Sequence, residues 1–243
     1  MQKTTGPFDI LLLIDIVEKT LKNRKMAKLY FFWDCDEVLV ETVNAFRKFV
    51  NDEFNVLLPR DLHDFERIEN QLEVERSTVT HWWSVFNTSN YLTKKGFGPH
   101  GELLNLILDL HHKGYESHIV TSKPEDECRN STEKWRNKYF GKSIKTIQFC
   151  NSYSKNKNLI IRKKSLAISE LITKEDFFIF AEDTHTHAID VARAFPDNSL
   201  VYLLEKTWNR NQDLPKLKNL ARVKDECKMV FKIRDFLGRS QFV

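Results

Sequence analysis

The sequence lacks any cysteine spacing of the kind that binds metals. Four of its 243 residues are cysteines, at positions 35, 128, 150 and 227, and no Cys-x-x-Cys occurs. Scattered cysteines of this kind are typical of reduced thiols in a reducing compartment. We therefore expect a cytoplasmic protein whose cysteines are free.

A long apolar segment is also missing. The most hydrophobic stretch, residues 8–17, contains Asp9 and Asp15, and it is half as long as the roughly 20 apolar residues that a membrane-spanning helix needs. The stretch also lacks the features of a signal peptide, because no small-residue cleavage site follows it and Lys3 is the one basic residue before it. We expect residues 1–27 to form a helical extension that packs on the core or binds a partner, and we predict no membrane association.

The chain has no strong charge of one sign. Its 38 Lys and Arg residues are nearly balanced by 34 Asp and Glu residues, which leaves a net charge of +4. This surplus is too small to predict nucleic-acid binding by itself. The composition, 41% hydrophobic and 30% charged, is typical of a globular protein, and a chain of this length can bury a sizeable core.

What the sequence does contain is a pair of acids at the end of a buried strand. Residues 28–33 form a short, aromatic-rich apolar run that stops at Asp34 and Asp36. In an extended chain these two side chains share a face, and Cys35 points away. Carboxylates about 5 Å apart repel by roughly 3 kcal/mol, so a shared proton, a lysine or Mg²⁺ must offset their charge. The alternative is a loop that begins with two solvated acids.

Strands and helices alternate along the rest of the chain. Short apolar runs predict strands, and apolar residues spaced by three and four predict helices. We expect strands at 115–120, 144–149, 177–181 and 199–204, and helices at 41–54, 102–112, 125–139, 185–195 and 226–237, with another beginning near 163. This alternation predicts an α/β fold, a Rossmann-like doubly wound parallel sheet.

A long polar stretch separates the first strand from the next predicted strand–helix unit. Because residues 41–96 are too many for a plain crossover, we interpret them as a helical cap inserted after the first strand, with residues 28–40 and 97–243 as the core. Trp82 and Trp83, together with Phe86, could stack on a base or sugar of a substrate. Packing within the cap is the alternative for all three rings.

Polar residues also end two later strands and begin one helix. Thr121 and Ser122 follow the second strand, where hydroxyls and helix amides can hold a phosphate, although Ser122 could simply cap the next helix. The remaining polar positions are Lys163 and Lys164, which open a helix, and Glu182 and Asp183, which follow the fourth strand. His185 and His187 flank these acids and could act as metal ligands, but their side chains diverge at a helix start, so we expect them to be solvated.

These four motifs, in this order, resemble the haloacid dehalogenase-like (HAD) superfamily of phosphohydrolases, over about residues 28–210. Two details resemble its 5′(3′)-deoxyribonucleotidase-like branch. One is residues 36–39, Asp-Glu-Val-Leu, which lead into an amphipathic helix. The other is Thr121-Ser122 followed by residues 132–135, Thr-Glu-Lys-Trp, and by residues 208–210, Trp-Asn-Arg.

The resemblance implies a role for each acid. Asp34 would be the nucleophile that forms an aspartyl-phosphate, and Asp36 would act first as general acid and then as general base. Mg²⁺ would be held by Asp34, by the backbone carbonyl of Asp36 and by Asp183. The branch tends to have paired aspartates where this chain has Glu182 and Asp183, so Glu182 would bind the metal directly or through a water molecule.

The resemblance also implies how the phosphate is bound. Thr121, or Ser122 instead, would bind the transferring phosphoryl group, and Lys164 would neutralise charge on the nucleophile and the phosphate. Of the adjacent lysines Lys163 and Lys164, we choose Lys164 because it better opens the helix. Phosphoryl transfer depends mainly on positioning and charge neutralisation, which this set of residues supplies.

We therefore expect a Mg²⁺-dependent phosphomonoesterase that acts on a small phosphorylated metabolite, preferably a nucleoside monophosphate. Phosphate removal from nucleic-acid ends is a second interpretation, prompted by the lysine-rich residues 155–164. A third is a non-catalytic binding or scaffold protein, prompted by Glu182 and by the N-terminal extension. Transfer of phosphate to an acceptor other than water also stays open, and the sequence does not indicate the oligomeric state.

Overall fold

A computed structural model describes residues 28–59 and 73–239 of the chain. The predicted N-terminal helix and residues 60–72 of the predicted cap lie outside these ranges. The strands are β1 (Leu29–Trp33), β2 (Glu116–Thr121), β3 (Thr146–Phe149), β4 (Phe177–Glu182), β5 (Ser199–Leu204) and β6 (Leu220–Val223). The helices are α2 (Thr42–Phe54), α4 (Arg76–Thr88), α5 (Tyr91–Lys95), α6 (Gly101–His112), α7 (Glu125–Tyr139), α8 (Lys164–Ser169), α9 (His185–Ala194) and α10 (Glu226–Arg239).

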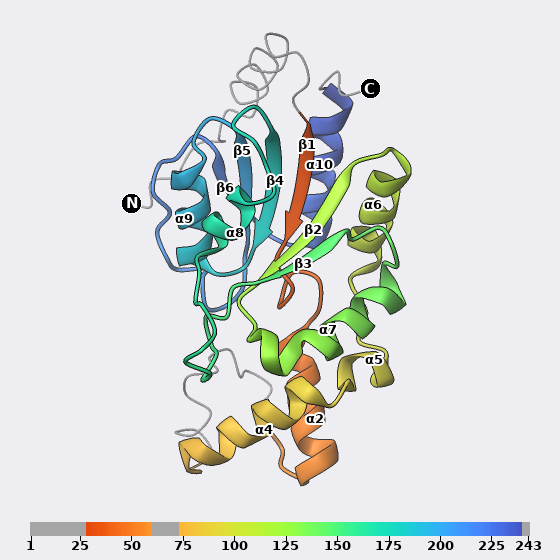
Figure 1. The fold of residues 1–243 in the computed structure, drawn as a ribbon, viewed down its shortest axis with the longest axis vertical. Coiled ribbons are helices and arrows are strands. Elements are labelled where there is room, and N and C mark those ends of the chain that lie inside the picture. The colour runs from red at the N-terminus through yellow and green to blue at the C-terminus, as the bar shows by residue number, and fades with distance from the viewer. Residues whose placement is uncertain (1–27, 60–72, 240–243) are drawn as a thin grey trace, which may run out of the picture.

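The six strands form one parallel sheet in the order β3-β2-β1-β4-β5-β6, with helices on both faces (Figure 1). This arrangement confirms the predicted doubly wound α/β fold. β1 lies in the interior of the sheet and pairs with β2 and β4, which follow it in the chain only after long intervals. The crevice outside the carboxyl ends of such strands is the usual ligand-binding position.

Side chains of β1 alternate between the two faces, as expected for a strand with a period of two. Phe31 and Trp33 belong to a core cluster with buried residues of α6 and α10. Tyr30 and Phe32 belong to a second cluster with residues of α8 and α9. Both faces are therefore covered, which explains why the sequence of β1 is apolar throughout and does not alternate.

The sixth strand was not predicted from the sequence. β6 has four residues, of which Leu220 and Val223 are buried, whereas Ala221 and Arg222 are partly exposed. It pairs with β5 alone, at the edge of the sheet. An edge strand this short contains too few apolar residues to stand out as a run.

Helices α2, α4 and α5 lie between β1 and β2 in the chain, beyond the carboxyl ends of the strands (Figure 1). They share a third apolar cluster, whose buried aromatic members are Phe46, Phe49, Trp82, Phe86 and Tyr91. Polar contacts join this group to α7: Ser131 donates to the Asn87 carbonyl, and Lys138 donates to that of Thr93. The assignment of these helices to a cap, with limits at residues 41 and 96, stays a prediction.

All four cysteines are free. Within residues 28–59 and 73–239, no helix combines the length and the hydrophobicity that crossing a membrane requires.

Candidate active site

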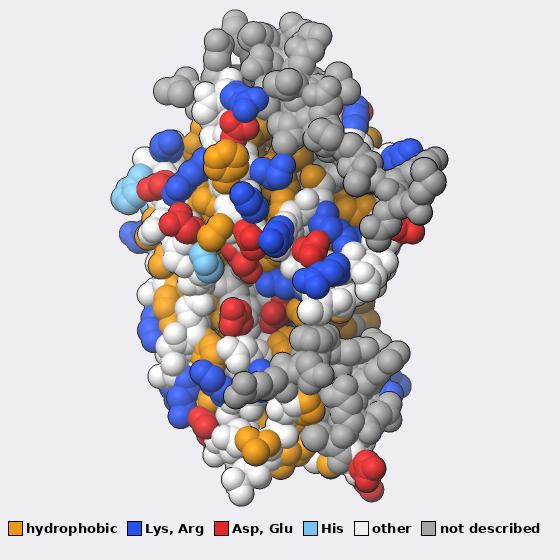
Figure 2. Space-filling view, turned by 180° about the vertical axis from the view of Figure 1, so that it is seen from behind, with side chains coloured by type: hydrophobic (Ala, Val, Ile, Leu, Met, Phe, Trp, Pro, Cys, Tyr) orange, Lys and Arg blue, Asp and Glu red, His pale blue; other side chains and the backbone are white. Residues whose placement is uncertain are grey.

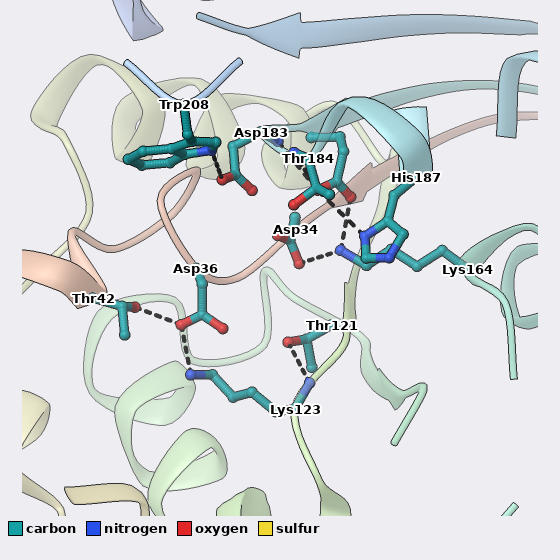
Figure 3. Close-up of polar contacts among 11 residues, drawn as sticks. Asp34, Asp36, Thr42, Thr121, Lys123, Lys164, Asp183, Thr184, His187 and Trp208 are labelled. Carbon is teal, nitrogen blue, oxygen red and sulfur yellow. Dashed lines mark hydrogen bonds and ion pairs between the residues drawn. The ribbon is translucent and has the colours of Figure 1, made fainter. Parts of the chain in front are cut away.

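The predicted motif residues gather at the carboxyl edge of the sheet (Figure 3). Asp34 follows β1 directly, and its amide donates to the carbonyl of Ala181 in β4 at 2.9 Å, which continues the pairing of the two strands by one residue. Glu182 is the last residue of β4, and Asp183 follows it. The acids are therefore positioned by two adjacent, fully buried strands.

Lys164 joins the two strand ends. Its Nζ lies 2.6 Å from Asp34 Oδ1 and 2.7 Å from Glu182 Oε2, and all three side chains are buried. The lysine occupies this position because α8 begins at Lys164 and packs against the sheet. Lys163 precedes the helix, and its exposed side chain pairs with Asp190 instead. The structure thus places Lys164, and not its neighbour, in the acidic cluster.

Both carboxylate oxygens of Glu182 accept hydrogen bonds. Oε2 accepts from Lys164, and Oε1 accepts from the backbone amides of Asp183 and Thr184 at 3.2 and 2.9 Å. Although burial opposes ionisation, the Lys164 ammonium lowers the pKa of Glu182 to about 2. Glu182 is therefore a fixed anion that holds Lys164, a role that the sequence did not reveal.

Asp183 is oriented by residues from a distant loop. Trp208 Nε1 donates to its Oδ2 at 3.2 Å, and Asn209 Nδ2 donates to its backbone carbonyl at 2.7 Å. Burial raises the pKa of Asp183 well above its usual range, and the charges of Glu182 and Asp34 raise it further. Trp208 and Asn209, two residues of the late motif noted in the sequence, therefore contribute directly to the geometry of the acids.

Carboxylate oxygens of Asp34, Glu182 and Asp183 all lie within 4.8 Å of one another. Burial, reinforced by Glu182, also raises the pKa of Asp34, to about 7, even though Lys164 opposes the shift. Three carboxylates and one ammonium leave two negative charges in a buried cluster, which two protons or one divalent cation would neutralise. Hard oxygen donors of this type suit Mg²⁺. The residues present therefore fit a divalent metal ion.

Asp36 has partners of its own. Its Oδ1 accepts hydrogen bonds from Thr42 Oγ1 and from Lys123 Nζ, the latter at 2.6 Å (Figure 3). The chain turns directly after Asp36, with Glu37 at a φ of 58°, and the shared face predicted for Asp34 and Asp36 stays a prediction. Each aspartate is paired with a separate lysine, which offsets the repulsion expected between them. Lys123 was not predicted as a site residue, since its pairing with Asp36 depends on folding.

Thr121 and Ser122 end β2 beside these acids. The Thr121 hydroxyl accepts a hydrogen bond from the Lys123 amide at 3.3 Å. The buried Ser122 hydroxyl has no hydrogen-bond partner among the described residues, so Ser122 does not cap α7, contrary to the alternative considered from the sequence. Asn151 Oδ1 instead accepts from the Glu125 amide, at the first residue of α7. Both hydroxyls therefore remain candidates for binding a ligand.

The two tryptophans of α4 lie in the third apolar cluster. Trp82 is buried, and Trp83 stacks on Phe46 with ring centroids 3.7 Å apart. These contacts favour core packing, and substrate stacking by Trp82 or Trp83 stays a prediction. Of the two histidines, His185 is hydrogen-bonded to the Asp213 carbonyl, while His187 lies beside Glu182 with Nδ1 3.9 Å from its Oε1.

No protein-family model matches the sequence, and a search of curated proteins finds no match. Solved structures do share the fold. A predicted phosphatase from Clostridium acetobutylicum has a TM-score of 0.56 at 16% identity, over 86% of this chain and 100% of that one. A HAD family hydrolase from Deinococcus radiodurans R1, with bound phosphate and sodium, has a TM-score of 0.55 at 14% identity, over 87% and 97%.

A third structure, of a protein assigned as a HAD hydrolase from Bacillus subtilis and bound to magnesium, has a TM-score of 0.50 at 12% identity, over 85% and 98%. The chain therefore has the fold of the haloacid dehalogenase-like hydrolases, with an acidic cluster at the carboxyl edge of its sheet. Its resemblance to the deoxyribonucleotidase-like branch stays a prediction.

The raised pKa values predict that metal binding at the candidate acidic cluster depends on pH. Because protons compete with the metal for Asp34, whose pKa is about 7, and for Asp183, Mg²⁺ should bind more tightly at pH 8 than at pH 6. Mg²⁺ at 100 times its Kd should raise the free energy of unfolding by about 2.7 kcal/mol. Thermal unfolding with and without Mg²⁺ at both pH values measures this stabilisation by the metal. Asp183→Asn should lose the stabilisation, and an equal effect at both pH values would contradict the prediction.

Proposed function

We propose that the protein is a Mg²⁺-dependent phosphomonoesterase that hydrolyses a small phosphorylated metabolite, preferably a nucleoside monophosphate. One observation carries the proposal: Asp34, Glu182 and Asp183 form a buried cluster whose charge Lys164 only partly neutralises. The cluster lies near the end of β2, which carries Thr121 and Ser122, and near a fourth acid, Asp36. Phosphoryl transfer requires this combination of an anionic nucleophile, neutralising charges and a nearby proton donor.

The reaction would proceed in two steps. A carboxylate oxygen of Asp34 attacks phosphorus, and the bond between phosphorus and the leaving oxygen breaks while Asp36 donates a proton to that oxygen. Asp36 then accepts a proton from water as the water attacks the aspartyl-phosphate, which releases phosphate and restores Asp34. Lys123 lies close enough to Asp36 to hold the carboxylate in place between the steps.

Asp34 and Asp183 would hold Mg²⁺, which supplies charge neutralisation for the phosphoryl oxygens when bound. Glu182 would act mainly through Lys164, since both of its oxygens already accept hydrogen bonds. The backbone carbonyl of Asp36 remains the third proposed ligand. Thr121 and Ser122, at the carboxyl end of the neighbouring strand β2, would bind the phosphoryl group through their hydroxyls, of which that of Ser122 has no hydrogen-bond partner among the described residues.

The solved neighbours support the reaction class. One is a predicted phosphatase, one was solved with phosphate and one with magnesium. The protein surface gives no support for a polymer substrate on the face shown in Figure 2, where basic and acidic side chains intermingle. The mixed charges on this face are compatible with the preferred substrate, a small phosphate ester.

A panel of phosphate esters tests the proposal, with phosphate release measured in Mg²⁺ and again after chelation with EDTA. We expect Mg²⁺-dependent release from p-nitrophenyl phosphate and from deoxynucleoside monophosphates. Faster release from a terminally phosphorylated oligonucleotide, with strong sensitivity to salt, would support action on nucleic-acid ends instead. No release from any ester would leave the binding or scaffold interpretation.

A further inference from the structure

The loop formed by residues 150–163 borders the candidate active site. It connects β3 to α8 and extends beyond the carboxyl ends of the strands, below α8 and α9 in the view of Figure 1. Its first residues run alongside the end of β2: the Cys150 amide donates to the Thr121 carbonyl at 2.8 Å, and the Ser152 amide donates to the Ser122 carbonyl at 3.1 Å. The backbone of the next residue, Tyr153, therefore follows directly on the segment that pairs with Thr121 and Ser122.

Asn151 fixes the course of this loop. Its backbone adopts a φ of 58°, its Oδ1 accepts from the Glu125 amide at 2.8 Å, and its Nδ2 donates to the Ile160 carbonyl at 3.2 Å. The Arg162 amide closes the loop by donating to the Cys150 carbonyl at 3.0 Å. Tyr153 therefore projects from a loop whose two ends are anchored to the core and to each other.

Tyr153 is 70% exposed, which distinguishes it from the two tryptophans of α4. The pKa of its phenol is nevertheless raised, first by desolvation and also by the carboxylates of Asp34, Asp36 and Glu182. Tyr153 is thus a solvent-exposed residue on a loop that is hydrogen-bonded to the end of β2, and its phenol is within range of the charges of the candidate catalytic acids, so it lines the approach to the site. Its aromatic face is open to a ligand that enters there.

We propose that Tyr153 is a specificity-determining residue, whose ring stacks on the planar base of a nucleoside monophosphate when its phosphate is bound at Thr121 and Ser122. This inference rests on the proposed function and names the substrate class for the same site. Aromatic rings stack on every base, so the contact selects for a leaving group that carries a planar base and does not select for a particular base. The proposal also gives the loop of residues 150–163 the base-stacking role that was predicted for Trp82 and Trp83.

Steady-state kinetics with two esters test the assignment. Tyr153→Ala should raise KM for deoxyadenosine 5′-monophosphate about tenfold, which corresponds to one stacking contact of about 1.4 kcal/mol. KM for glycerol 3-phosphate, which has no planar group, should stay unchanged. Tyr153→Phe keeps the ring and should behave like the wild type with both esters. Ile160→Ala, a change at another exposed side chain of the same loop, is the matched control and should alter neither KM.

An equal increase in KM for both esters, or no increase for either, would overturn the stacking role while leaving the phosphatase intact. If the wild type releases phosphate from neither of these esters nor from p-nitrophenyl phosphate, the proposed function fails, and equilibrium binding in Mg²⁺ then decides the role of Tyr153. Stacking requires that deoxyadenosine 5′-monophosphate bind more tightly than inorganic phosphate and that Tyr153→Ala remove the difference. Equal binding of the two ligands to the wild type would refute it.

Discussion

Asp34→Asn should reduce phosphate release by at least roughly a thousandfold, the scale of loss seen when a catalytic nucleophile is removed. The amide is a poor nucleophile and cannot form the aspartyl-phosphate. The fold should tolerate the change, because Lys164 keeps its bond to Glu182 and the cluster loses one of its two uncompensated negative charges. The metal-free variant should therefore be at least as stable as the wild type. Phosphate release and thermal unfolding, measured on the same preparations, test both parts.

Asp197→Asn is the matched control for this substitution. Asp197 is 76% exposed and pairs with Lys218 on the surface, so the same chemical change there should affect neither activity nor stability. Wild-type turnover by Asp34→Asn would rule out the aspartyl-phosphate mechanism. Loss of activity accompanied by unfolding would instead mean that Asp34 is needed for the structure.

Lys164→Met should have the largest effect on stability. Removing the ammonium leaves the carboxylates of Asp34 and Glu182 buried without their partner, and breaking a buried ion pair in this way costs about 3 to 5 kcal/mol. Methionine keeps a similar volume, so the loss reports the charge and not a cavity. Phosphate release should fall as well, because Lys164 positions Asp34. Chemical denaturation in the absence of Mg²⁺ measures the change in the free energy of unfolding.

Lys163→Met provides an unusually close control, one residue away. Its side chain is 76% exposed and pairs with Asp190 at 3.1 Å, so the loss should stay below about 1 kcal/mol. Activity should be retained. Similar losses of stability in the two variants would contradict the placement of Lys164 in the acidic cluster.

Sequence patterns predicted the sheet well where strands are buried on both faces. The apolar runs at 28–33 and 177–181 correspond to β1 and β4, which lie next to each other and carry the acids. β6 escaped prediction because an edge strand with Ala221 and Arg222 between its two apolar residues leaves no clear pattern. The fold could therefore be predicted from the sequence except at its edge.

The candidate site was predicted less completely, for a physical reason. Asp34, Lys164 and Asp183 each belong to a motif at a strand or helix end, so their convergence follows from a parallel sheet. Lys123 and Asn151 belong to no such pattern, since their importance comes from partners distant in the chain, at Asp36 and at Glu125. The role of Glu182 was also hidden, because only its environment shows that both of its oxygens are engaged.

The interior position of β1 has a consequence for biosynthesis. During translation β1 leaves the ribosome long before β4, with which it pairs from Leu29 to Trp33. One edge of this aromatic strand must stay unpaired until β4 has emerged, and contacts between such distant segments form slowly. The nascent chain therefore exposes an unpaired, aggregation-prone strand for most of its synthesis. Chaperone binding at that stage would protect it from aggregation.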